Sequence, residues 1–147
     1  MRNSIKDFLH EANENDWIII SDLDEIPNPK KFSEFDKKFK FAFFEQKFFN
    51  YKFNMLNTST PKWYGSRICV KKFLKSPQWL RNIKIKERNF FKRFLLRQNY
   101  YIIKEGGWHF SDLKSPKELV QKINSFAHGE FNKTKFKNEN FIKQKIE

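Results

Sequence analysis

The chain has 147 residues, 39% of them hydrophobic, with 19 phenylalanines and a net charge of +13. This hydrophobic content predicts one packed domain over residues 1–147 and excludes a disordered chain, although 32% of the residues are charged. The single cysteine, Cys69, excludes an intramolecular disulfide, and the longest apolar runs are too short to span a bilayer.

The first elements are predicted from the spacing of apolar residues. Residues 4–13 have apolar side chains at helical spacing, and Trp17–Ile20 is a β-branched run that predicts a short, buried strand. Residues 21–29 combine two prolines with three carboxylates, which predicts a loop. A short helix is expected to begin near Pro29.

The middle of the chain is rich in aromatic residues that alternate with other residue types. This alternation predicts two strands, one over residues 39–43 and one over residues 49–53, with the aromatics in the core of a sheet. A third strand is expected over residues 66–73. The basic stretch 77–97 is compatible with a helix or with irregular structure.

The last third of the chain predicts one strand and two helices. Residues 100–103 predict a strand that leads into a turn at Gly106–Gly107. Ser115 and Glu118 have the spacing of a capping box, which predicts a helix that runs to about residue 125. A final amphipathic helix is expected over residues 140–146.

The charge is distributed unevenly along the chain. Residues 1–36 carry four basic and nine acidic side chains, a net charge of −5, whereas residues 71–97 carry ten basic and one acidic side chain, a net charge of +9. Carboxylates from the first segment can hold a cation while the second segment contacts phosphates. The alternative is that the basic segment is a solvated face. The protein is expected to be cytoplasmic, and the basic segment could also make peripheral contact with a membrane.

The strongest chemical signal is a group of three acids, Asp22, Asp24 and Glu25, that directly follows the strand over Trp17–Ile20. Open α/β sheets bind ligands at the carboxyl ends of their strands. Three neighbouring carboxylates repel one another, so a cation is expected between them, and oxygen ligands favour Mg²⁺ or Mn²⁺. The alternative is a solvated acidic turn.

Two further segments contain several chemically active residues, GGWHFSDL (residues 106–113) and SFAHGEFN (residues 125–132). Together with SDLDEIP (residues 21–27), they resemble glycosyltransferase family 17 in order and spacing. The resemblance implies an α/β, GT-A-like nucleotide-diphospho-sugar transferase fold, here without its amino-terminal strands. It also implies an inverting transfer of N-acetylglucosamine from UDP-GlcNAc to a glycan acceptor.

The resemblance carries over to individual residues. Asp22 and Asp24 match the D-x-D motif that places a divalent cation on the diphosphate of the donor, and Glu25 belongs to the same block. Trp108 and His109 match the Gly-Trp-His of the family. The Ala-His-x-Glu segment of the family is matched by His128, which could complete the metal shell, and by Glu130.

The sequence leaves the other roles in the reaction open. Arg67 or members of the basic segment could supply fixed positive charge to the leaving diphosphate. The acceptor hydroxyl needs a base, for which Asp112 and Glu130 are favoured because each lies near a matched histidine. Glu105 and Glu45 are further candidates, and the sequence does not choose among the four.

Two other functions are compatible with the sequence. The first is a basic, aromatic-rich module that binds nucleic acid through residues 71–97, against which the acidic first third of the chain argues. The second is a truncated, inactive transferase remnant that binds an acceptor or a partner protein. The expected partners of the chain are a nucleotide-sugar donor and a glycan acceptor, and nucleic acid is not expected.

Overall fold

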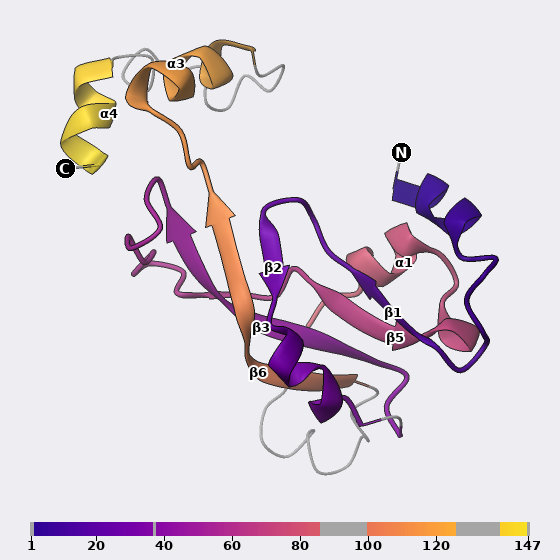
Figure 1. The fold of residues 1–147 in the computed structure, drawn as a ribbon. Coiled ribbons are helices and arrows are strands. Elements are labelled where there is room, and N and C mark those ends of the chain that lie inside the picture. Colours follow the sequence, from indigo (N-terminus) through magenta and orange to yellow (C-terminus); the bar gives the residue numbers. More distant parts are fainter. Residues whose placement is uncertain (1, 37, 86–99, 126–138, 147) are drawn as a thin grey trace. The chain divides into compact units, whose positions relative to one another are not determined.

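The chain forms a mixed α/β structure around a curled sheet, as the ribbon shows (Figure 1). The computed structural model describes residues 2–36, 38–85, 100–125 and 139–146. Two compact units divide the chain. Unit 1 comprises residues 1–47 and 62–109, and unit 2 comprises residues 48–61 and 110–147.

The sheet contains six strands within the part of the chain that the structure describes. They are β1 (Trp17–Ile20), β2 (Glu25–Pro27), β3 (Phe41–Asn50), β4 (Lys62–Trp63), β5 (Arg67–Val70) and β6 (Tyr100–Ser111). The strand order is β1-β5-β3-β6-β2, and β4 pairs with β3 beside this path. The pairs β1–β5, β5–β3, β3–β4 and β2–β6 are antiparallel.

Strands β3 and β6 run in the same direction, which makes the sheet mixed. A Cβ atom on Gly106 would lie 2.9 Å from the Cβ atom of Phe44. Two residues further along both strands, Gln46 Nε2 donates a hydrogen bond to the carbonyl oxygen of Trp108 at 3.3 Å. The residue numbers of β3 and β6 therefore increase in the same direction, so the two strands are parallel.

The helices are short. The 3₁₀ helices are η1 (Arg2–Phe8), η2 (Pro29–Glu34) and η3 (Lys71–Phe73), and the α-helices are α1 (Pro77–Asn82), α3 (Pro116–Ser125) and α4 (Glu139–Ile146). Helix α1 begins where the hydroxyl of Ser76 accepts a hydrogen bond from Trp79 N, with Pro77 in the first turn. The cap fixes the residue at which α1 begins within the basic segment.

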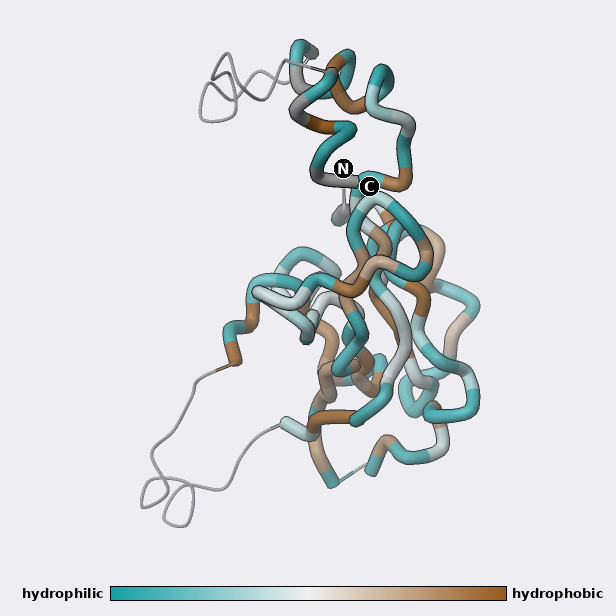
Figure 2. The backbone as a smooth tube through the Cα atoms, turned by 90° about the vertical axis from the view of Figure 1, so that its left-hand side faces the viewer, coloured by the Kyte–Doolittle hydropathy of each residue, from teal (hydrophilic) through white to brown (hydrophobic). Residues whose placement is uncertain are grey.

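The core of unit 1 has two apolar clusters of buried residues. The first contains Ile18, Ile20, Phe41, Phe43, Cys69 and Leu80. The second contains Phe35, Ala42, Phe44, Ile68, Val70 and Ile103. Successive residues of a strand point to opposite faces, so β3 and β5 supply both clusters. The hydropathy colouring shows short hydrophobic stretches that alternate with hydrophilic segments along the backbone (Figure 2).

Unit 2 has a smaller core. Leu119 of α3 and Ile142 of α4 are buried against one another, with Tyr51 and Val120 packed on them. Helix α3 has the predicted capping box, in which the carboxylate of Glu118 accepts hydrogen bonds from Ser115 N at 2.8 Å and from its hydroxyl at 2.6 Å. These hydrogen bonds lower the pKa of Glu118.

Several predicted elements are confirmed. The strand over Trp17–Ile20 has the predicted bounds. The helices expected over residues 115–125 and 140–146 correspond to α3 and α4. The membrane prediction rested on the length of apolar runs, and within the described ranges no helix has the length and apolarity needed to cross a bilayer.

Two predictions for the sheet are wrong. The stretches 39–43 and 49–53 are not separate strands. Strand β3 continues through Glu45, Gln46 and Lys47, and Gln46 is buried. The glycines Gly106–Gly107 do not end a strand. Strand β6 passes through them, and Gly107 adopts a φ of 133°, with no space for a Cβ atom, which would lie 2.1 Å from Ile26 O.

The other differences concern the type and the ends of elements. The helix expected over residues 4–13 is a 3₁₀ helix that ends at Phe8, and the loop 21–29 contains the short strand β2. The strand expected over residues 66–73 ends at Val70. In the basic stretch 77–97, α1 forms the start, and residues 86–97 lie outside the described residues.

The core of unit 1 can be tested with the substitution Phe44→Ala. Phe44 has no exposed surface, so truncation is expected to lower the free energy of unfolding by about 3–5 kcal/mol. Urea denaturation followed by circular dichroism would measure this change. Phe8→Ala is the matched control, because Phe8 is exposed and its loss should change stability by less than about 0.5 kcal/mol. Equal effects of the two substitutions would contradict the described core.

Candidate functional site

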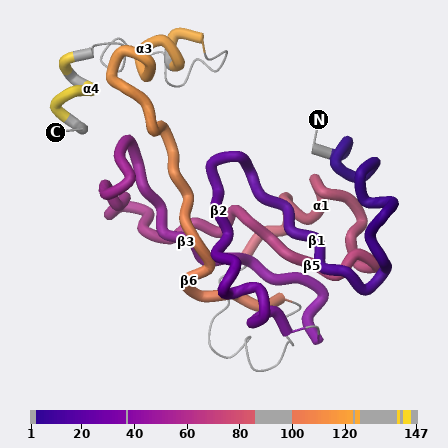
Figure 3. The backbone as a smooth tube through the Cα atoms, viewed as in Figure 1, coloured from indigo at the N-terminus to yellow at the C-terminus, as the bar shows by residue number. Residues whose placement is uncertain are grey.

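A tight turn connects β1 with β2 and carries the acidic residues (Figure 3). Glu25 N donates to the carbonyl oxygen of Asp22 at 3.0 Å. The hydroxyl of Ser21 donates to the carbonyl oxygen of Glu25 at 2.9 Å. It also lies 2.7 Å from the hydroxyl of Ser66, the residue that directly precedes β5. The turn therefore has a defined conformation, and Leu23 at its tip is fully exposed.

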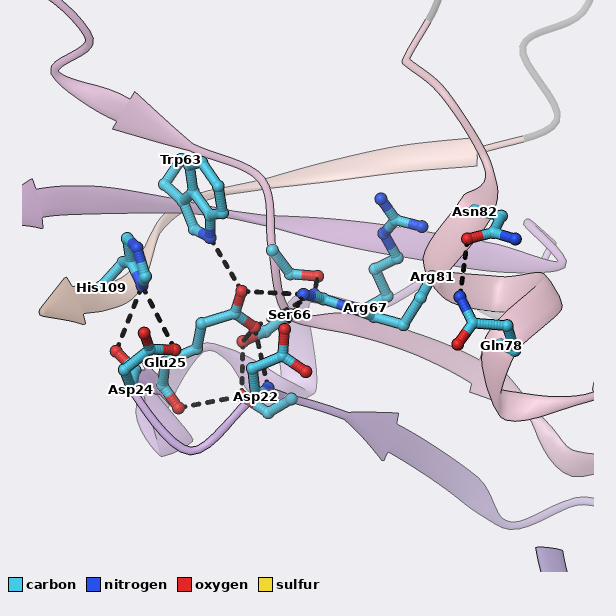
Figure 4. A network of polar contacts seen from close by, with 12 residues as sticks. Asp22, Asp24, Glu25, Trp63, Ser66, Arg67, Gln78, Arg81, Asn82 and His109 are labelled. Atoms are coloured by element: carbon cyan, nitrogen blue, oxygen red, sulfur yellow. Dashed lines mark hydrogen bonds and ion pairs between the residues drawn. The ribbon is translucent and has the colours of Figure 1, made fainter. Parts of the chain in front are cut away.

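Glu25 is the buried member of the acidic group. Its side chain is 1% exposed, and it accepts hydrogen bonds from Trp63 Nε1 at 2.8 Å and from Ser66 Oγ at 3.1 Å (Figure 4). The backbone N–H of Asp22 donates to the same carboxylate at 3.1 Å. A buried carboxylate is stable only when its oxygens are hydrogen-bonded and its charge is paired.

Arg81 of α1 supplies the opposite charge. Its Nη1 and Nη2 atoms lie 3.1 Å from the two carboxylate oxygens of Glu25, so the pair is bidentate. The same guanidinium donates to the carboxylate of Asp22 and to the carbonyl oxygen of Gly65. Only 9% of the Arg81 side chain is exposed. Arg81 therefore neutralises one of the negative charges within the acidic group.

Gly65 makes this arrangement possible. A Cβ atom on Gly65 would lie 1.7 Å from Oε1 of Glu25 and 2.2 Å from Nε1 of Trp63. Contacts this short are excluded for any side chain. The glycine therefore provides the space in which the Glu25 carboxylate meets its donors.

His109 of β6 lies on the other side of the turn. Its ring stacks on Trp63, with centroids 4.5 Å apart and an interplanar angle of 12°. Nδ1 of His109 lies 3.3 Å from the carbonyl oxygen of Asp24 and 3.7 Å from its carboxylate. In the tautomer that carries its proton on Nδ1, the ring donates to this carbonyl oxygen, whereas in the other tautomer Nδ1 has the lone pair that a metal ion requires. The side chain of Asp24 is 51% exposed.

Three of these residues have the chemistry of a metal centre. Ligand atoms of Asp24, Glu25 and His109 all lie within 4.8 Å of one another. The donor set fits a divalent cation only in part, because both oxygens of Glu25 already accept hydrogen bonds. Asp24 and His109 are the residues that could hold the ion. Asp22 could join them only by exchanging its contact with Arg81.

A basic hollow of about 720 Å³ adjoins the acidic group on the side of α1. Tyr64, Arg67, Arg81 and Lys84 are among its lining residues, with Ile83. Arg67 donates to the carbonyl oxygen of Leu80, and its guanidinium lies 4.9 Å from the ring centroid of Phe43. The predicted residue Arg67 thus shares a concave surface with Arg81, where an anionic group could bind.

The remaining predicted residues are not established as members of this group. Trp108 is partly exposed beside Ile26, its partner in β2, on the face opposite to His109. Asp112 belongs to unit 2, where Lys122 pairs with it at 2.5 Å. The two predicted residues of the third sequence block, His128 and Glu130, lie outside the described residues.

Of the further base candidates, Glu45 lies in unit 1 beside the basic hollow. Its carboxylate accepts hydrogen bonds from the hydroxyl of Tyr64 at 2.8 Å and from Lys62 at 3.2 Å. Glu105 is exposed, in a left-handed backbone conformation with a φ of 51°. Only Glu45 is therefore connected to a residue that lines the hollow.

Sequence reasoning missed four residues that build the site, namely Trp63, Gly65, Ser66 and Arg81 in its pairing role. The sequence analysis included Arg81 only as a member of the basic segment. Ser76 and Pro77 are a helix-start signal, which could have placed Arg81 in a helix. Part of the charge asymmetry is neutralised internally, since Lys71 also lies 3.4 Å from Glu14. The rest of the basic segment, residues 86–97, falls outside the described residues.

Comparisons of the chain with protein-family models, with curated proteins and with solved structures gave no match. A function for this chain is therefore inferred from its own side chains. Among them, the acidic turn, His109 and the basic hollow form one continuous neighbourhood in unit 1.

The role of Arg81 can be tested with Arg81→Met, which keeps an unbranched side chain but removes the charge. The buried Glu25 would lose its counter-ion, and the free energy of unfolding is expected to fall by about 3–5 kcal/mol. Chemical denaturation at neutral pH would measure the loss. Lys84→Met removes a charge from the exposed Lys84 in the same segment and should have little effect.

A second substitution separates charge from packing. Glu25→Gln combined with Arg81→Met removes both members of the pair, so no buried charge is left without a partner. The double variant is expected to be more stable than Arg81→Met alone. A double variant that is as unstable as the sum of the two single changes would rule out the ion pair as the dominant interaction.

Proposed function

We propose that the chain is a metal-dependent glycosyltransferase that moves a sugar from a nucleotide-sugar donor to a glycan acceptor. The supporting observation is the meeting of Asp24 and His109, which are far apart in sequence and lie 3.7 Å apart in unit 1. These residues belong to two of the three blocks that resemble glycosyltransferase family 17. The resemblance makes UDP-GlcNAc the first donor to test.

Asp24 and His109 would hold the divalent cation, Mn²⁺ or Mg²⁺. When bound, the ion would neutralise negative charge on the leaving diphosphate. Two protein ligands form an incomplete coordination shell, and such ions commonly complete it with phosphate oxygens and water. The proposal therefore predicts weak metal binding by the protein alone and stronger binding when a nucleotide is present.

The basic hollow is suited to the diphosphate of the donor. Arg67 and Lys84 provide positive charge, whereas the charge of Arg81 is already paired with Glu25 and Asp22 at the border of the hollow. Fixed positive charge beside a leaving group favours the transition state over the ground state. Tyr64 and Ile83 add apolar surface in the same hollow.

Glu45 is the base that we propose for the acceptor hydroxyl. Its bond with Tyr64 connects it to the basic hollow, and it is partly exposed, so a proton can leave to solvent. Asp112, which the sequence favoured, belongs to unit 2 and does not line the basic hollow. A base of this kind contributes about 10²–10⁴-fold to the rate.

The mixed α/β sheet is compatible with a GT-A-like domain, which is the fold that we propose. In unit 1 the acidic turn follows the carboxyl end of the buried strand β1. Nucleotide-binding α/β sheets hold their ligands at this type of position.

The proposal is tested by the binding of UDP-GlcNAc with and without Mn²⁺, measured by titration calorimetry. Binding is expected only with Mn²⁺ present, and Asp24→Asn is expected to weaken it about tenfold or more by removing a metal ligand. Asp24 is exposed, so the substitution should not unfold the protein. Asp7→Asn, at another exposed position of unit 1, is the matched control. Metal-independent binding of equal strength in all three proteins would overturn the proposal.

The base is tested with Glu45→Gln, which keeps the hydrogen bond from Tyr64 and removes the basic carboxylate. Transfer to a glycan acceptor is expected to slow by about 10²–10⁴-fold, while the binding of UDP-GlcNAc stays unchanged. Asp112→Asn serves as the comparison, with a small expected effect on the rate. The reverse order of the two effects would transfer the role of base to Asp112.

A further inference from the structure

Unit 2 contains a hollow of its own, formed where the end of β3 leads into a hairpin and where α3 begins. Its volume is about 480 Å³, and residues 51–54 line one side while residues 113–115 and Glu118 line the other. The site discussed above belongs to unit 1, so this hollow is a separate feature. A volume of this size lies within the range of small-molecule sites.

The hollow has an exposed aromatic wall. Phe53, which lines the hollow, is 72% exposed. Its ring is held in place from behind by Phe110, at a centroid distance of 5.2 Å and an angle of 68°. Phe110 in turn stacks on Phe49 at 5.5 Å. Much of the Phe53 ring is thus open to solvent while Phe110 supports it, and an exposed aromatic ring can stack on the apolar face of a sugar.

The backbone around the hollow is strained. Tyr51 and Asp112 adopt left-handed conformations, with φ of 64° and 58°, which are unfavourable for residues other than glycine. Tyr51 N donates to the carbonyl oxygen of Ser111 at 3.0 Å, and the carboxylate of Asp112 pairs with Lys122. Burial, and then the charge of Asp112, raise the pKa of Tyr51. Strain that is held by such contacts is typical of binding sites.

The polar side chains at the rim are mainly donors. Lys52, Asn54 and Lys114 line the hollow, whereas the carboxylate of Glu118 is already engaged by Ser115. Ammonium and amide groups beside an aromatic face match a ring that carries hydroxyl groups and a carboxylate. An anionic membrane surface would also attract lysines and phenylalanine, but a concave hollow fits a ring better than a flat bilayer.

We infer that this hollow of unit 2 binds a sugar ring, and that an acidic sugar binds better than a neutral one. As a carbohydrate-binding site, it depends only on Phe53, its support by Phe110 and the polar rim.

The inference is tested by saturation-transfer NMR on the full chain without metal or nucleotide. The probes are methyl β-D-glucuronide and methyl β-D-glucoside, which differ only in the carboxylate. Saturation is expected on the ring protons, with tighter binding of the glucuronide. Phe53→Ala should weaken binding about threefold to tenfold, as the loss of an aromatic contact implies. Leu56→Ala, at another exposed position of the hairpin that does not line the hollow, should leave it unchanged.

Five outcomes decide the matter. Failure of both glycosides to bind, or equal affinities in the wild type and Phe53→Ala, would overturn the inference. Equal affinities for the two glycosides would overturn the preference for an acidic sugar. Phe53-dependent binding to phosphatidylserine vesicles without glycoside binding would replace the sugar with a membrane. Glycoside binding that persists in Asp24→Asn supports the inference, even where the titration of UDP-GlcNAc overturns the proposed function.

Discussion

The ion pair between Glu25 and Arg81 is the interaction on which unit 1 depends. Removing a carboxylate and a guanidinium from water costs several kcal/mol for each ion, and only close pairing with further hydrogen bonds offsets this cost. Trp63 and Ser66 supply those bonds to Glu25, and Gly65 leaves the space for them. The pair also joins the acidic first third of the chain to the basic middle.

Three acids that are close in sequence consequently have different environments. Glu25 is buried and fully hydrogen-bonded, Asp22 is held by the same arginine, and Asp24 is half exposed beside His109. From the sequence alone, the three acids would be expected to serve equally well as metal ligands. The turn gives them separate tasks, because its internal hydrogen bonds direct one carboxylate inward and another outward. Asp24 is therefore the member best suited to bind a ligand.

The sequence predicted the features that depend on local chemistry. The strand at Trp17–Ile20 and the capped helix α3 follow from short patterns, and the acids and His109 could be named as candidates. The uninterrupted β3 could not be predicted, because the fit of Gln46 into the interior depends on a hydrogen bond to Ser66, which directly precedes β5 and lies 20 positions along the chain. Arg81 was missed as a partner of Glu25 for the same reason, since 56 positions separate them.

The single thiol of the chain has a practical consequence. Cys69 is buried in β5, between β1 and β3, and burial raises its pKa to about 12. A reagent that needs the thiolate cannot react with it while the sheet is closed. The speed of alkylation therefore reports how often the centre of the sheet opens. Cys69 is therefore an intrinsic probe of local unfolding, and no engineered label is needed.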